Sequence, residues 1–206
     1  MRKLAILTFV SLDGVMQGVS SPDEDPSGGF TQGGWAAPYW DGVMDQVRSE
    51  AMSEPYDMLF GRKTYEMFAA YWPNLSSEDP EARRMNEAAK YVISSTLQRL
   101  AWQNTVLVSG DVVEEVARLK ERDGPLLQVH GSWALIQALL AADLIDEFRL
   151  WTFPVVLGAG KRLFGDGLMP RTLRLKKSAP SGNGVVMTVY RRDQASAAAG
   201  PVSVTS

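Results

Sequence analysis

The chain has 206 residues, of which 45% are hydrophobic and 22% charged, a composition that is ordinary for a globular protein. Its formal net charge of −3 at pH 7 gives no electrostatic reason to expect nucleic acid as a partner, because phosphate binding needs clustered lysine and arginine. No run of about eighteen apolar residues is present, so no transmembrane helix and no membrane partner are expected.

Residue types that usually bind metals are scarce. There is no cysteine and His130 is the single histidine, so a zinc site of the usual nitrogen and sulfur ligands cannot form. The acidic run at 23–26 is the one compact candidate for magnesium, and we interpret it as a solvated turn. The first ten residues are basic and then apolar without a following cleavage site, so they predict a buried strand and a cytoplasmic protein.

Strand and helix patterns alternate along the first half of the chain. Residues 3–11 form the continuous apolar run of a strand buried on both faces. A Gly-, Pro- and Ser-rich loop over 12–38 follows, and loops of this length are usually functional or disordered. The elements predicted next are a helix from Tyr39 to Met52, a strand over 57–60, a helix straight after Gly61, a short helix within 76–89, and strands over 90–94 and 105–109.

The second half continues the alternation and ends in a hairpin. Asp111 and Glu114 resemble a capping box that opens a helix, and Gly124 follows its end. The later elements are a strand into a turn over 125–132, a helix over 133–143, a strand over 147–156, and a hairpin of 173–179 and 184–192.

This order of elements predicts an α/β fold with a mainly parallel central sheet, an antiparallel C-terminal hairpin and helices on both faces, so that three layers form. Residues 1–193 are expected to form a single domain, and the Ala- and Ser-rich residues 194–206 a disordered tail. Ligands of such sheets bind beyond the carboxyl ends of the strands.

Two strand-to-helix turns carry the strongest chemical signal. Each has a glycine where a strand ends and a helix begins, and a helix N-terminus with free N–H groups suits phosphate. A hydroxyl cluster after a third strand strengthens the case for a phosphate-rich ligand, although a glycine that only makes a tight turn remains the alternative. The residues are Gly61, Arg62, Lys63 and Thr64 at the first turn, His130, Gly131, Ser132 and Trp133 at the second, and Ser94, Ser95 and Thr96 in the cluster.

Candidates for acid–base chemistry are few. Asp13 ends the first strand, and Asp41 and Asp45 lie four residues apart on one helical face. Asp41 could equally cap the helix. His130 could move protons, but its position just before a helix favours a structural hydrogen bond.

Six stretches, in this order, resemble the dihydrofolate reductase superfamily, and most closely the stand-alone bacterial proteins related to the riboflavin-biosynthesis reductase domain. The resemblance spans nearly the whole ordered chain and implies a reductase that binds NADPH. The stretches are FVSLDGVMQG (9–18), LFGRKTYEMF (59–68), KYVISSTL (90–97), VLVSGD (106–111), QVHGSWALIQALLAADLIDEFRL (128–150) and FPVVLGAGKRLF (153–164).

The resemblance implies a cofactor site around both turns. The turn at Gly61 would hold the adenosine-side phosphates, Arg62 with the nearby hydroxyls would select NADPH over NADH, and the turn at Gly131 would receive the pyrophosphate. Dihydrofolate reductase has a run of glycines at the second turn, from which this chain departs. The residues implied to bind the cofactor are Phe9, Val10, Met16, Gln17, Gly61, Arg62, Lys63, Thr64, Ser94, Ser95, Thr96, His130, Gly131, Ser132 and Trp133.

On the substrate side, the resemblance implies one catalytic acid on the helix before the first turn, Asp41 or Asp45, with Asp41 preferred. The aromatic segment 28–40 is interpreted as a lid that stacks on a flat ring and excludes water, with a subunit interface as the alternative. The residues expected to contact substrate are Asp13, Phe30, Trp35, Tyr39, Trp40, Trp72 and Phe153.

The function expected from these residues is NADPH-dependent hydride transfer to a planar, pterin-like or pyrimidine-like heterocycle. A non-catalytic nucleotide- or flavin-binding module of the same fold is the alternative. A homodimer is expected, because members of this superfamily commonly pair.

Overall fold

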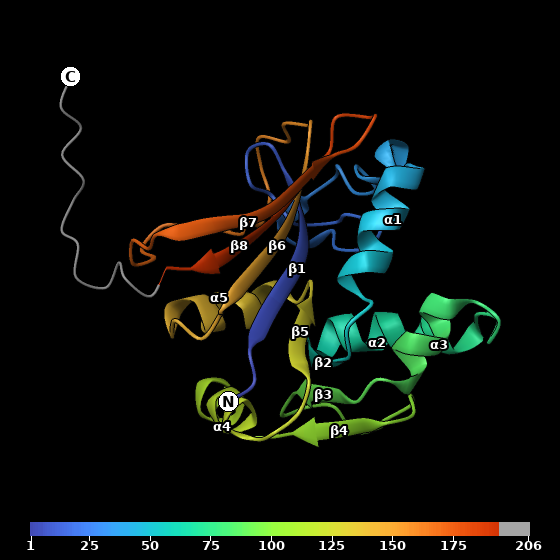
Figure 1. Cartoon of the computed structure of the whole chain (residues 1–206), viewed down its shortest axis with the longest axis vertical. Helices are drawn as coiled ribbons and strands as arrows, with labels where there is room; N and C mark the ends of the chain where they lie inside the picture. Colours follow the sequence, from blue (N-terminus) through green and yellow to red (C-terminus); the bar gives the residue numbers. More distant parts are fainter. Residues whose placement is uncertain (194–206) are drawn as a thin grey trace.

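The computed structural model describes residues 1–193. The tail predicted for 194–206 lies outside the described residues. Eight described strands form one sheet (Figure 1), in the order β4-β3-β2-β5-β1-β6-β8-β7. The strands are β1 (Leu4–Ser11), β2 (Tyr56–Gly61), β3 (Lys90–Ile93), β4 (Thr105–Val108), β5 (Leu126–His130), β6 (Glu147–Phe153), β7 (Leu173–Pro180) and β8 (Val186–Arg192).

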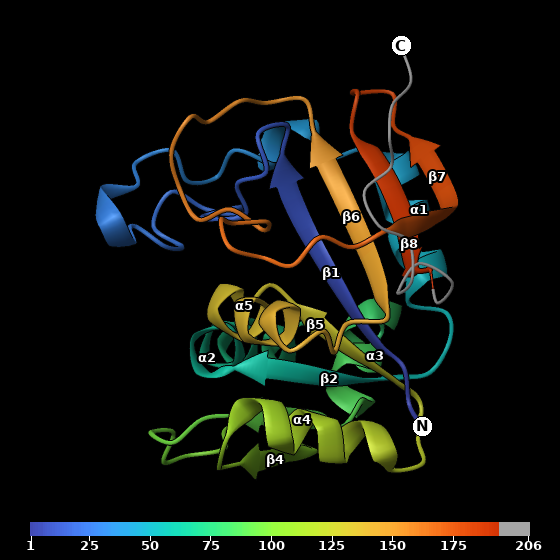
Figure 2. The ribbon, with the colours of Figure 1, turned by 90° about the vertical axis from the view of Figure 1, so that its left-hand side faces the viewer.

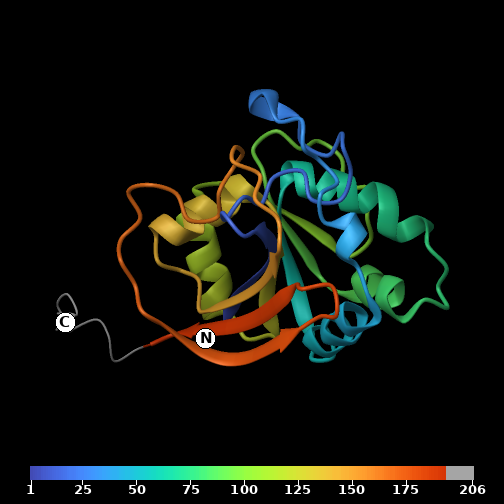
Figure 3. The same ribbon diagram turned by 90° about the horizontal axis from the view of Figure 1, so that it is seen from above.

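The sheet is parallel from β4 to β6 and antiparallel where β8 pairs with β6 and β7. Two groups of helices cover its faces, with α4 and α5 on one side and α1, α2 and α3 on the other (Figure 3). The α/β fold predicted from the sequence is confirmed. The helices are α1 (Gly42–Ala51), α2 (Arg62–Tyr71), α3 (Pro80–Glu87), α4 (Val112–Glu121) and α5 (Trp133–Ala141).

Alternation along β1 builds the two cores. Leu4, Ile6 and Val10 are buried in the cluster that includes the apolar face of α5, because successive side chains of a strand point to opposite faces. Phe9 faces the other way and stacks on Trp151 of β6, with ring centroids 5.0 Å apart. β1 is therefore covered on both faces, as its continuous apolar run predicts.

Element boundaries differ from the predictions where side chains decide them. The helix α1 begins at Gly42 rather than at Tyr39, because Asp41 caps it by accepting from the Met44 N–H at 3.0 Å. The strand β6 ends at Phe153, directly before Pro154.

At α4 only half of the predicted capping box forms. Asp111 accepts from the N–H groups of Val113 and Glu114, both at 3.0 Å. The Glu114 side chain does not complete the box but pairs with Arg118 at 3.1 Å.

Loops gather where β1 and β6 end. The segment after β1 and the segment after β6 run side by side beyond the arrowheads of the two strands (Figure 2), and Val15 bridges to Arg162 in antiparallel fashion. Three single-turn helices lie in the loops: Ser27–Gly29, Ala37–Tyr39 and Trp72–Asn74.

A candidate ligand-binding cleft at the carboxyl ends of the strands

A cleft of about 1170 Å³ opens at the carboxyl ends of β1, β2 and β5. Leu7 and Phe9 of β1 line its floor, and Phe68 of α2 lines a wall. The two turns predicted from the sequence form another wall, and residues 16–27 of the loop after β1 form the rim. The location agrees with the general rule for ligand sites in open α/β sheets.

The two turns are joined to each other. The strands β2 and β5 are neighbours in the sheet, and the N–H of Gly61 donates to Ser132 Oγ at 3.0 Å. Gly131 and Ser132 both adopt left-handed conformations, with φ of 59° and 61°. That conformation costs a serine about 1–2 kcal/mol, and the hydrogen bond to Gly61 offsets part of the cost.

The helices at these turns begin without a side-chain cap. Among the described helices, α1, α3 and α4 are capped by Asp41, Asp79 and Asp111, whereas α2 and α5 have no side-chain cap hydrogen bond. The first N–H groups of α2 and α5 therefore remain available at one edge of the sheet, with Arg62 and Lys63 beside them. Free N–H groups and positive charge at paired helix ends suit an anion such as a diphosphate.

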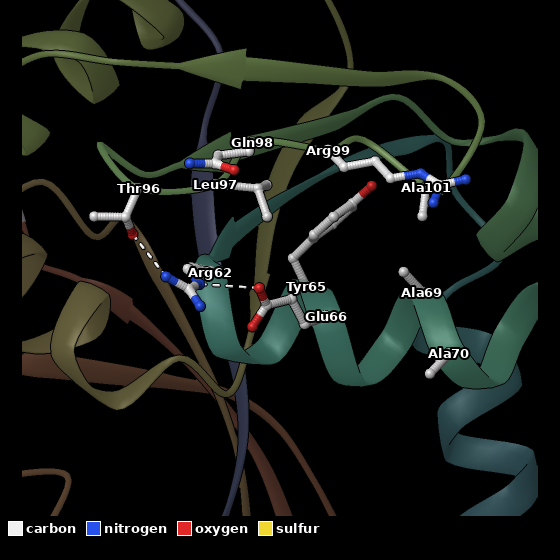
Figure 4. A pocket seen from close by; sticks show the side chains of 10 residues that line it. All are labelled: Arg62, Tyr65, Glu66, Ala69, Ala70, Thr96, Leu97, Gln98, Arg99 and Ala101. Atoms are coloured by element: carbon white, nitrogen blue, oxygen red, sulfur yellow. Dashed lines mark hydrogen bonds and ion pairs between the residues drawn. The ribbon is translucent and has the colours of Figure 1, made fainter.

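A second hollow of about 600 Å³ lies between α2 and residues 96–101 (Figure 4). Arg62 stands at its mouth, donating from Nη1 to Thr96 Oγ1 and from Nε to Glu66 Oε1, both at 2.9 Å. Arg62 and Glu66 line both cavities, so the hollow adjoins the cleft at the start of α2. The Ser94 hydroxyl accepts from the N–H groups of Thr96 and Leu97 and so shapes this turn.

The rim of the cleft is cross-linked by polar contacts. The Gln17 side-chain amide donates to the carbonyls of Asp25 and Ser27 at 2.9 and 2.8 Å, and its oxygen accepts from the Lys161 N–H at 3.0 Å. The Lys161 ammonium pairs with Asp25 at 2.6 Å. Trp133 donates from its indole to the Arg162 carbonyl at 2.9 Å. The Gln17 and Asp25 contacts tie the loop after β1 to the loop after β6, and the Trp133 contact ties the start of α5 to the loop after β6.

His130 is a titratable residue on the wall of the cleft. It is 9% exposed, and its Nε2 lies 2.7 Å from Gln128 Nε2. Burial, together with the positive charge of Arg149, lowers the pKa of His130 to about 4. The ring is therefore neutral at pH 7.

Neither predicted catalytic acid lies among the residues that line the cleft. The carboxylate of Asp41 accepts from the Met44 N–H and, with its second oxygen, from the Gly182 N–H at 3.0 Å. Asp45 accepts from the Trp40 indole at 2.9 Å and pairs with Arg48 at 3.0 Å. Both carboxylates are held at the N-terminal end of α1, and the capping interpretation of Asp41 is the one that the geometry supports.

The aromatic segment packs inward instead of over the cleft. Phe30 and Trp35 are 8% exposed and belong to a buried cluster with Phe153, whose ring meets Trp35 edge-on at 5.3 Å. The Trp35 indole also donates to the Gln17 carbonyl at 2.8 Å. Packed against Phe153, these side chains are shielded from water, and none of them is among the residues that line the cleft.

The other residues predicted on the substrate side also lie outside the cleft lining. Tyr39 packs edge-on against Phe153, and Trp40 stacks on Trp151 at 5.6 Å. Trp72 packs against Phe68 from behind α2, at 6.2 Å. Asp13, whose hydrogen bond from Ser11 lowers its pKa, accepts from the Leu157 and Gly158 N–H groups and holds the loop after β6.

Most residues predicted to bind the cofactor do come together. Val10 points into the opposite core, and Ser94 and Ser95 stand outside the residues that line either cavity, although they belong to the turn that carries Thr96. Sequence reasoning missed Leu7, Phe68 and Lys161, because only the folded chain shows that these side chains face the cleft. The predicted residues that line the cleft are Phe9, Met16, Gln17, Gly61, Arg62, Lys63, Thr64, His130, Gly131, Ser132 and Trp133.

Two further properties of the described residues bear on the site. Over residues 1–193 no three histidine or carboxylate side chains lie close enough together to hold a metal ion. No helix in that part of the chain has the length and apolar character needed to cross a bilayer.

Comparisons with known proteins agree with this architecture. The family model described as "RibD C-terminal domain" matches residues 2–187. Among curated proteins, YyaP of Bacillus subtilis is 29% identical over 198 residues, covering 92% of this chain and 94% of YyaP. YwjB of the same organism is 26% identical over 190 residues, covering 92% of this chain and 98% of YwjB.

Solved structures share the fold. A putative riboflavin biosynthesis protein from Shewanella sp. PV-4 superposes with a TM-score of 0.64 at 22% identity, covering 94% of this chain and 100% of that one. A pyrimidine reductase-like protein from Corynebacterium diphtheriae gives 0.60 at 12% identity, covering 94% and 92%. Dihydrofolate reductase from Enterococcus faecalis, complexed with NADP(H) and RAB-propyl, gives 0.57 at 13% identity, covering 93% and 97%. At these identities the likeness establishes the fold alone.

Proposed function

The chain belongs to the RibD C-terminal domain family, and on that premise we propose that it is an NADPH-dependent reductase of a planar heterocycle, pterin-like or pyrimidine-like. The single observation that carries the proposal is the cleft at the strand ends. It combines an apolar floor with two helix N-termini that lack side-chain caps.

The residues present fit a dinucleotide phosphate. The first N–H groups of α2 and α5 have no side-chain caps. The hydrogen bond between Gly61 and Ser132 holds the two helix N-termini side by side, an arrangement that suits an anion. Arg62, with Thr96 next to it, supplies a positive charge for a 2′-phosphate. When bound in such a site, NADPH supplies the hydride.

The protein's own residues bind the ring, orient it and exclude water from the cleft. Leu7 and Phe9 offer an apolar surface on which a flat ring can lie, and Phe68 closes one side of it. The loop after β1 forms the rim and is held in place by the contacts of Gln17 and Lys161. We assign no chemical step to Asp41 or Asp45, because their carboxylates are engaged at the start of α1.

A second candidate function is a non-catalytic module that binds the nucleotide, or a flavin, without reducing anything. The engagement of Asp41 and Asp45 away from the cleft favours it, since a reductase of this type needs a source of protons near the substrate.

Calorimetric titration of the purified protein with NADPH and then NADH tests the proposal. Tight binding of NADPH with a clear preference over NADH is expected, followed by loss of NADPH absorbance with members of a panel of oxidised pteridines and pyrimidines. Binding without turnover across the panel would favour the module. No binding of either nucleotide would refute the reductase.

A further inference from the structure

A row of buried polar side chains runs beneath the cleft, on the face of the sheet covered by α1 and α2. Gln128 is fully buried in the central strand β5 and Glu147 is 4% exposed in β6. Buried polar groups are costly unless they are hydrogen-bonded. Here each one has a partner, and the row ends at His130 on the wall of the cleft.

The row has a single consistent hydrogen-bond direction. Arg149 donates from Nη1 to Gln128 Oε1 and to the Ala51 carbonyl, both at 2.7 Å, and from Nε to Glu147 at 2.8 Å. A guanidinium can only donate, so the Gln128 oxygen must face Arg149 and its amide nitrogen must face His130. Arg191 donates to the second Glu147 oxygen at 2.7 Å, which fixes the far end.

This direction sets the tautomer of His130. The Gln128 amide nitrogen carries only hydrogens to donate and lies 2.7 Å from His130 Nε2, so Nε2 must accept and carries no proton. The ring is neutral, because burial and Arg149 lower its pKa to about 4. Its one N–H is therefore at Nδ1.

The Nδ1–H points away from Gln128, across the ring from Nε2. Within residues 1–193 this nitrogen has no hydrogen-bond partner. It is also not one of the buried, unpaired side-chain atoms of that range, so solvent reaches it. Around the ring, Tyr56 and Phe68 present aromatic surfaces at 6.3 and 6.1 Å, and the charged groups behind it are Arg149 and Glu147. The free N–H thus opens on the cleft.

We propose that the Nδ1–H of His130 is the donor that this cleft offers to an acceptor atom of the heterocycle, a carbonyl oxygen or an unprotonated ring nitrogen. The inference rests on the proposed function, since it takes the ring substrate to lie against the same wall. A fixed neutral donor in an apolar setting both selects a ring with an acceptor at that position and stabilises negative charge on it. Gln128 and Arg149 act as positioning residues that hold the tautomer.

The single histidine makes a direct test feasible on untagged, ¹⁵N-labelled protein. A ¹H–¹⁵N correlation spectrum of the imidazole should show a neutral ring protonated at Nδ1 at pH 7, unchanged down to about pH 5. Titration with lumazine (pteridine-2,4-dione) in the presence of NADP⁺ should shift the Nδ1–H signal. A proton on Nε2, a titration near the ordinary histidine pKa, or an Nδ1–H signal that lumazine leaves unchanged would each overturn the inference.

Three variants separate the role of the donor from folding. His130→Phe keeps a ring but removes the N–H and should weaken lumazine about tenfold. His130→Asn places an amide N–H near the position of Nδ1 and should recover most of that loss. Gln128→Glu puts an acceptor beside Nε2 and should raise the pKa of His130. Equal lumazine affinity in wild type and His130→Phe would contradict the assignment.

NADPH affinity is measured on the same samples. If NADPH does not bind the wild type, the proposed function fails whatever the imidazole does. If NADPH binds and the tautomer is Nε2–H, the inference about His130 fails and the reductase proposal stands.

Discussion

Replacing Arg62 by alanine should separate NADPH from NADH. The guanidinium uses Nε for Glu66 and one Nη1 hydrogen for Thr96, which leaves three of its five hydrogens for a phosphate. A hydrogen bond between charged groups contributes about 1.5–3 kcal/mol. Because the Arg62 side chain is 47% exposed, solvent screening places the loss near the lower end, about 1.4 kcal/mol or tenfold in Kd. NADH, which lacks the 2′-phosphate, should change by less than about twofold.

The assay is calorimetric titration of wild type and variant with both nucleotides at low and high salt, since screening should reduce the NADPH preference of the wild type. Arg118→Ala is the matched control: Arg118 pairs with Glu114 at i,i+4 on α4 as Arg62 pairs with Glu66 on α2. Equal weakening of NADPH and NADH in Arg62→Ala would refute the 2′-phosphate assignment, and so would the same loss in Arg118→Ala.

Three further changes test the structure around the site. Ser132→Ala removes the acceptor of the Gly61 N–H and should lower the free energy of unfolding by about 1 kcal/mol and weaken NADPH severalfold. Asp41→Ala removes the α1 cap and the contact to Gly182, and should cost about 1 kcal/mol of stability with NADPH affinity unchanged. Burial lowers the pKa of Lys90 to about 8, so the unfolded state binds more protons between about pH 8 and its ordinary pKa near 10.5. The free energy of unfolding should therefore rise through that window, by about 3 kcal/mol, in denaturant titrations.

For each of these three predictions a second variant tests the physical reason given. Ser132→Gly relieves the left-handed strain while losing the same hydroxyl, so it should be more stable than Ser132→Ala. Asp41→Asn can still cap and should keep most of the stability; loss of NADPH-dependent turnover in it without loss of stability would restore Asp41 as a catalytic acid. Lys90→Met should flatten the pH dependence, and an unchanged slope would contradict the assignment to Lys90.

Local patterns were sufficient for most of the fold. The apolar run of β1 and the helical spacing of α5 can be read from neighbouring residues in the sequence. Gly61 and Gly131 mark the two strand-to-helix turns, and Gly131 has the left-handed conformation that glycine suits. The contact between these two turns could not be predicted from the sequence. It requires β2 and β5 to be adjacent strands, and local patterns do not give the strand order.

The site was harder to predict, because its decisive contacts join distant residues. Asp41 reads as cap or catalytic acid until Gly182, 141 positions later, is seen to take its second oxygen. The sequence predicts that Trp35 contacts a ligand, and only the fold shows its ring packed edge-on against Phe153. The orientation of Gln128, on which the tautomer of His130 depends, follows from Arg149, 21 positions away.

The cross-linked rim has a thermodynamic consequence. Gln17 and the pair Lys161–Asp25 already hold the loop after β1 against the loop after β6, so the conformational entropy of ordering this segment is lost when the chain folds and not when a ligand arrives. Association should then follow a single kinetic phase, without a slow isomerisation after encounter, and its entropy should reflect water released from the apolar floor rather than chain ordering.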